Sequence, residues 1–147
     1  MKEDVAMRWI TKAGNDLKAV KHLLTFEDAP TDVISFHCQQ SVEKYLKAYL
    51  TLAGVRVKRT HDLDTILYLC IEEDKDFKEL DNEEISNLTF YAVEIRYPEE
   101  YIELTIGEVE ELYETARKVR EFVIKKLEEK GLRLQRLEEL KVKKHGS

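Results

Sequence analysis

The stretch from Phe36 to Ala48, which reads FHCQQSVEKYLKA, decides how this chain folds because its polar and apolar residues each recur with the spacing of a helix. Counting from His37, the polar residues Gln40, Lys44 and Lys47 follow three, seven and ten positions later. On a helix with 3.6 residues per turn these four side chains form one row. The apolar row beside it consists of Ile34, Cys38, Ser41/Val42, Tyr45, Ala48 and Leu52. The pattern predicts a long helix with a packed face and a polar row next to it.

Two interpretations of the polar row remain open at this point. It is an ordinary solvated face with a satisfied histidine, or it is a binding site. Imidazole, amide and ammonium groups, with Gln39 and Glu43 at their flanks, are donors and acceptors that suit phosphate, sugar and base. The spacing of the residues does not choose between the two.

Helical spacing continues along the rest of the chain, where apolar residues recur at intervals of three and four. The expected helices cover about 4–24, 31–54, 60–70, 83–96 and 105–127. No segment shows the sustained alternation of a strand, and short connections place consecutive helices antiparallel. The sequence therefore predicts an all-α protein, an up-and-down four-helix bundle with an additional short or broken helix near residues 83–96. We expect the bundle to span residues 1–130 and a basic tail or helix extension to span 131–147.

Local signals mark where several of these helices begin and end. Gly54 is expected to end the second helix in a left-handed conformation. The expected helix starts are Thr31 and Thr60 as N-caps, and Asp81 with Glu84 and Thr105 with Glu108 as capping boxes.

Composition limits the class of protein and its partners. With 147 residues, 43% hydrophobic and 37% charged, the chain is long enough for one globular core. Its richness in Glu and Lys, with few amides, is typical of proteins from thermophiles. A net charge of −6 argues against a surface devoted to duplex DNA, whose phosphates are bound by Lys and Arg.

No segment has the apolar length of a signal peptide or a membrane span, so we expect a cytoplasmic protein without a membrane partner. Cys38 and Cys70 lie in apolar helical patterns, as reduced core cysteines do. The chain has no HExxH motif, no paired-carboxylate motif for metals and no glycine-rich phosphate loop. We therefore expect no metal site and no cofactor.

Two further polar segments are candidates for ligand contact. Arg59–Asp62 lies at an expected helix start, where free backbone N–H groups suit a phosphate. Arg96–Pro98 lies at an expected helix end, where Arg96 suits bidentate contact with a phosphate or carboxylate. Ordinary explanations stay open for both segments, since Asp62 can simply cap a helix and an arginine can simply pair with an acid.

The stretch Phe36–Ala48 resembles the signature helix of the HEPN family (higher eukaryotes and prokaryotes nucleotide-binding). The resemblance extends over roughly residues 5–127, through Trp9, Ala13, Asp16 and Leu17, Thr60–Leu63, Arg96–Pro98 and the apolar last helix. It implies a helical bundle that is usually a homodimer and is related to the substrate-binding domain of kanamycin-type nucleotidyltransferases. It also implies a partner, a separately encoded minimal nucleotidyltransferase, in a toxin–antitoxin-like pair.

Some members of this family are metal-independent ribonucleases that carry an Arg followed after four to six residues by a His. Here Arg96 is followed by YPEEYIE, which contains no histidine. We therefore expect no catalytic residue, and a module that binds a nucleotide or presents a substrate. The residues expected to bind the nucleotide are His37, Gln40, Lys44, Lys47, His61 and Arg96. Two alternatives stay open: a ribonuclease that uses His37 or His61 instead, and a purely structural interaction subunit.

Overall fold

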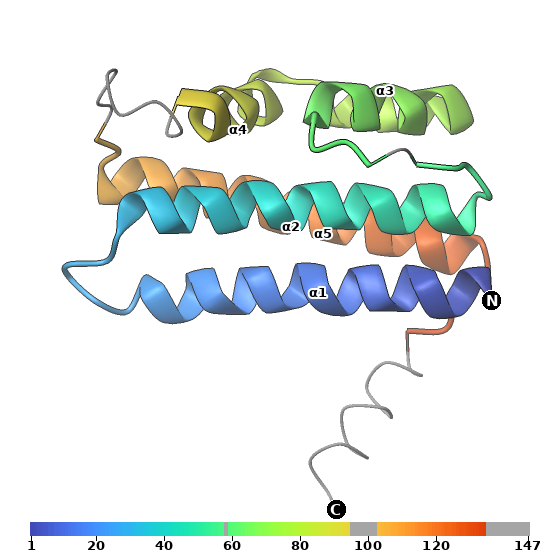
Figure 1. Cartoon of the computed structure of the whole chain (residues 1–147), viewed down its shortest axis with the longest axis horizontal. Coiled ribbons are helices and arrows are strands. Elements are labelled where there is room, and N and C mark those ends of the chain that lie inside the picture. Colours follow the sequence, from blue (N-terminus) through green and yellow to red (C-terminus); the bar gives the residue numbers. More distant parts are fainter. Residues whose placement is uncertain (58, 95–102, 135–147) are drawn as a thin grey trace, which may run out of the picture.

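A computed structural model of the chain describes residues 1–57, 59–94 and 103–134 (Figure 1). These residues form five α-helices and one 3₁₀-helix, and no strand is found among them. The elements are α1 (Lys2–Leu23), α2 (Thr31–Leu52), α3 (Leu63–Glu73), η1 (Lys75–Leu80), α4 (Glu83–Glu94) and α5 (Ile106–Glu129). The predicted all-α bundle is confirmed.

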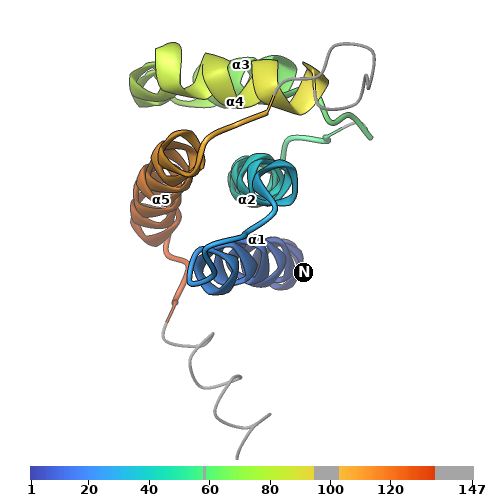
Figure 2. The ribbon, with the colours of Figure 1, turned by 90° about the vertical axis from the view of Figure 1, so that its left-hand side faces the viewer.

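The helix α2 lies at the centre of the bundle and contacts α1, α3, α4 and α5. The long helices α1, α2 and α5 make three rods, and α3 and α4 together form a layer on one side of them (Figures 1 and 2). The chain direction reverses between α1 and α2, whereas α2 and α5 run the same way (Figure 1). The pair α3 and α4, joined by η1, thus stands in the place of the fourth rod.

Because α2 is surrounded on most sides, its polar row is half-buried at His37, Gln40 and Lys44 and buried at Lys47. Of its 22 residues, 13 are buried, among them Gln39, Glu43 and Lys47. A buried charge needs a partner, since taking an ion out of water costs several kcal/mol. The central position of α2 therefore requires its neighbours to supply partners for the polar row.

Two of the expected helix boundaries are formed as predicted. The Thr105 hydroxyl accepts a hydrogen bond from the backbone of Glu108, whose carboxylate accepts one from the backbone of Thr105, so the capping box is present. Gly54 has φ +79°, and the bonds from its own N–H and that of Val55 to the carbonyls of Thr51 and Leu50 make a Schellman ending.

Three of the expected caps are wrong. Thr31 is the first residue of α2, not its cap, and no side chain caps that end. Asp62, not Thr60, caps α3, where its carboxylate accepts a bond from the backbone N–H two residues later. Before α4 it is Asn82 whose side chain accepts a backbone bond, from the N–H three residues later. At α3 and α4 a neighbouring polar residue, rather than the expected one, lies where its side chain can accept the backbone hydrogen bond.

The 3₁₀-helix η1 was not expected. It lies in a charged segment, and its two apolar residues, Phe77 and Leu80, are buried. Most of the expected tail, residues 135–147, and the end of the fourth helix lie outside the described residues. Within the described parts of the chain, no helix combines the length and the apolar character needed to span a bilayer.

Candidate functional site

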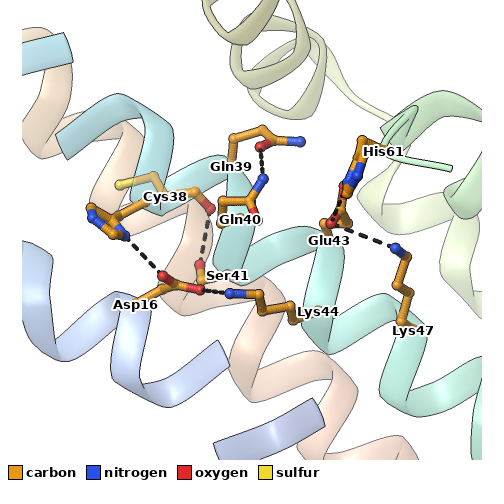
Figure 3. A network of polar contacts seen from close by, with 10 residues as sticks. Asp16, Cys38, Gln39, Gln40, Ser41, Glu43, Lys44, Lys47 and His61 are labelled. Atoms are coloured by element: carbon orange, nitrogen blue, oxygen red, sulfur yellow. Dashed lines mark hydrogen bonds and ion pairs between the residues drawn. The ribbon is translucent and has the colours of Figure 1, made fainter. Parts of the chain in front are cut away.

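One half of the α2 polar row is organised by a carboxylate from α1. The Asp16 side chain, 11% exposed, faces Lys44 Nζ at 2.6 Å and His37 Nδ1 at 2.8 Å (Figure 3). An ionised carboxylate can only accept hydrogen bonds, so the Nδ1–H of His37 is the donor. Asp16, His37 and Lys44 are here called the Asp16 network. His37 and Lys44 keep part of their surface in solvent, 29% and 21% of the side chain.

The other half of the row is organised by a carboxylate of α2 itself. Glu43, whose side chain is 2% exposed, has His61 Nδ1 at 3.1 and 3.2 Å from its two oxygens. Lys47 Nζ lies 3.6 Å from the same carboxylate, at the i,i+4 spacing of a helix. Glu43, Lys47 and His61 are here called the Glu43 network. Its outer member is His61, which comes from the segment before α3 and is 68% exposed (Figure 3).

The Lys47 ammonium also lies over the indole of Trp9, 5.3 Å from the ring centroid. Lys47 is 7% exposed, so its charge is stabilised by the Glu43 carboxylate and by the electron-rich face of the ring. Trp9 and Asp16 are seven residues apart, which places them on one stripe of α1. The same face of α1 therefore contributes to both networks.

Gln40 lies between the two networks (Figure 3). Its Nε2 donates a hydrogen bond to Oε1 of Gln39 at 3.0 Å, and Gln39 is only 3% exposed. The buried amide of Gln39 is thus the partner of the more exposed one.

The networks contain no activated thiol nucleophile. Burial, and next to it the Asp16 carboxylate, raises the pKa of Cys38 to about 12, so this thiol stays protonated near neutral pH. Each carboxylate faces one lysine and one imidazole, so the two networks together carry a net positive charge when the imidazoles are protonated. Among the described residues, no three His, Cys, Asp or Glu side chains gather closely enough to hold a metal ion.

Of the six residues expected to bind a nucleotide, the structure joins His37 to Lys44 through Asp16 and Lys47 to His61 through Glu43, while Gln40 bonds to Gln39. The sixth, Arg96, lies outside the described residues. The sequence did not single out Asp16 and Glu43 as the centres of the site. Two signals could have found them, the i,i+4 spacing of Glu43 with Lys47 and the helical register of Asp16 with Trp9.

Two grooves elsewhere on the bundle take no part in the networks. A groove of about 520 Å³ between α1 and α5 is lined in part by Tyr45, and one of about 740 Å³ between α4 and α5 has five glutamates among its eleven lining residues. Neither is lined by a residue of the Asp16 or Glu43 network. The polar face of α1, α2 and the α3 start is therefore a separate feature.

Comparison with known proteins agrees with the fold. The family model of the HEPN domain matches residues 6–129, which includes every member of both networks. No curated protein matches the chain. Since the family match covers most of the sequence, the chain belongs to the HEPN family.

Proposed function

We propose that this protein is a non-catalytic, nucleotide-binding helical module that works with a separately encoded minimal nucleotidyltransferase in a toxin–antitoxin-like pair. Membership of the HEPN family supports a helical module of the nucleotide-binding type. The partner role is carried over from the family resemblance of the sequence. The nucleotide would meet the polar face formed by the Asp16 and Glu43 networks.

The observation that carries the proposal is the way His61 is held. Its Nδ1 faces the carboxylate of Glu43, one of the most buried side chains in the bundle, while most of its ring is in solvent. A carboxylate that accepts from Nδ1–H fixes the ring orientation and points Nε2 away from Glu43, and the Nε2–H of the protonated ring is the donor that a phosphate needs. An imidazole used only as surface polarity would not require a buried carboxylate behind it.

The two lysines have a different role in this proposal. Their ammonium groups already face Asp16 and Glu43, so they are paired cations and do not bind the phosphate directly. They offset the carboxylates instead, so that a phosphate approaching His61 does not meet uncompensated negative charge. Charge compensation of this kind decides whether an anion can approach a buried acid.

Calorimetric titration of the protein with AMP, ADP and ATP tests the proposal. We expect binding by the wild type and a loss of affinity of about ten-fold or more in His61→Ala. The matched control is His22→Ala, an exposed histidine in the last turn of α1 outside both networks. Equal affinity in wild type and His61→Ala, or no binding of any of the three nucleotides, would refute the proposal.

We also propose a homodimer, supported by the distribution of exposed apolar side chains. Five of the eight large exposed apolar side chains among the described residues are Phe26, Val33, Phe36, Phe90 and Ile106, and the other three are Met1, Val5 and Tyr68. The first five lie on elements that meet at one end of the bundle (Figure 1). The elements are the α1–α2 connection, the start of α2, α4 and the start of α5. Sedimentation should give a dimer at tens of micromolar, about the range in which an interface of ordinary size holds. A monomer at that concentration contradicts this assignment.

A ribonuclease is the second candidate, because both networks contain a histidine oriented by a carboxylate. Such pairs serve as general acids and bases in several hydrolases. We expect no cleavage of RNA by the purified protein, since the histidine that should follow Arg96 is missing. Cleavage that survives EDTA and disappears in both His61→Ala and Arg96→Ala would establish the ribonuclease instead.

A further inference from the structure

The amide of Gln40 has unused hydrogen-bonding capacity. One of its two N–H groups is donated to the buried Oε1 of Gln39 at 3.0 Å. A glutamine amide offers two donors and one carbonyl acceptor. Among the described residues nothing bonds to the second N–H or to Oε1 of Gln40. The side chain therefore presents one donor and one acceptor side by side.

This donor–acceptor pair lies on α2 before Glu43, the residue whose carboxylate holds His61. Gln40 lies one turn before Glu43 on α2, about 5 Å along the helix axis, and it sits between the two networks in Figure 3. The phosphate end of the ligand is assigned to His61, beyond Glu43. A base attached through its ribose then extends along α2 toward Gln40.

We infer that Gln40 selects the base and that the ligand is an adenine nucleotide, an inference that rests on the proposed function. A glutamine amide pairs with adenine through two bonds, one to N7 from its N–H and one from the N6 amino group to its Oε1. Guanine presents two acceptors, O6 and N7, on the same edge, so O6 would face Oε1 of Gln40 without a hydrogen. In the observed orientation one N–H of Gln40 is bonded to Oε1 of Gln39, which leaves the other N–H and Oε1 of Gln40 for the base.

The inference is tested on the wild-type protein with AMP, IMP and 7-deaza-AMP. IMP replaces the N6 amino group with an oxygen, and 7-deaza-AMP lacks the N7 acceptor. We expect AMP to bind at least about five-fold more tightly than either analogue, the lower end of the discrimination given by one bidentate pair. In Gln40→Met, which keeps the length of the side chain, the three affinities should become equal. Asn87→Leu, on α4 and lining the groove of about 740 Å³, is the matched control and should retain the preference.

Failure of this inference can be told apart from failure of the proposed function. If AMP and IMP bind wild type equally while His61→Ala binds neither, the nucleotide site stands and base selection by Gln40 is refuted. A preference for AMP that survives in Gln40→Met also refutes it. If no nucleotide binds the wild type, both the function and the inference fall.

Discussion

The Asp16 network makes a quantitative prediction about stability. Asp16 joins α1 to α2 through two charge-assisted contacts, 2.6 Å to Lys44 and 2.8 Å to His37, with its own side chain 11% exposed. A hydrogen bond to a charged group contributes about 1.5–3 kcal/mol net. Removal of one partner from a fully buried pair costs about 3–5 kcal/mol. Because Lys44 and His37 are partly solvated, we expect Asp16→Ala to lower the free energy of unfolding by an amount at the lower end of this range, about 3 kcal/mol.

Urea unfolding followed by circular dichroism measures this loss. A change of about 3 kcal/mol should lower the midpoint without changing the slope, and should lower the melting temperature by roughly 6–12 °C. Asp28→Ala, an exposed acid in the α1–α2 connection, is the matched control and should change the free energy of unfolding by less than about 0.5 kcal/mol.

A double-mutant cycle with Lys44→Met separates the ion pair from other effects of the substitutions. If the pair is formed as described, the double variant should be about 1–2 kcal/mol more stable than the sum of the single losses predicts. Additive losses, or a loss below about 0.5 kcal/mol in Asp16→Ala, would show that Lys44 is not held by Asp16. The polar row would then be a solvated face.

Three other predictions concern the scaffold. Lys126 is 8% exposed and contacts Asp74 and Asp76, so Lys126→Met should cost about 2 kcal/mol at pH 7 in urea unfolding. Hydrogen bonding to Lys126 lowers the pKa of Asp74, so this stabilisation is present at neutral pH and is lost as acid protonates Asp74. If the difference in free energy of unfolding between Lys126→Met and wild type does not become smaller below about pH 4, this explanation is contradicted. Burial raises the pKa values of Cys38 and Cys70, so neither thiol should react with Ellman's reagent before unfolding in urea; reaction of the native protein would contradict their burial. Gly54→Ala should lower the free energy of unfolding by about 1 kcal/mol because Gly54 has φ +79°. Gly107→Ala, in the first turn of α5 with ordinary φ, should be neutral or stabilising. Equal effects of the two substitutions would contradict the Schellman ending.

Much of the fold follows from local signals in the sequence. The periodic spacing of apolar residues gives all the long helices, and Thr105 with Glu108 gives the start of α5, because a capping box depends only on residues three positions apart. The same reasoning fails between close competitors, as at Asp62 against Thr60 and Asn82 against Asp81. It also misses η1, whose two apolar residues are too few to show a period.

The sequence predicts the polar row of the site but not the residues that pair with it. The spacing of His37, Gln40, Lys44 and Lys47 predicts a polar row because all four lie on one helix. Which of the 30 acids pairs with Lys44 depends on how α1 packs against α2, and that is a tertiary property. The contact between His61 and Glu43 likewise depends on the path of the chain between α2 and α3. Partners from other elements were therefore beyond reach, while the row itself was not.

The central claim is that His61, oriented by Glu43, binds the phosphate of a nucleotide. Nitrogen-detected NMR of the imidazole side chains during a titration with AMP tests it most directly. The account predicts that in the AMP complex the His61 ring carries a hydrogen on both Nδ1 and Nε2, that AMP shifts its Nε2 resonance while His22 does not move, and that Glu43→Gln abolishes the shift. A His61 resonance that stays in place at saturating AMP, or one that moves equally in Glu43→Gln, would contradict the claim.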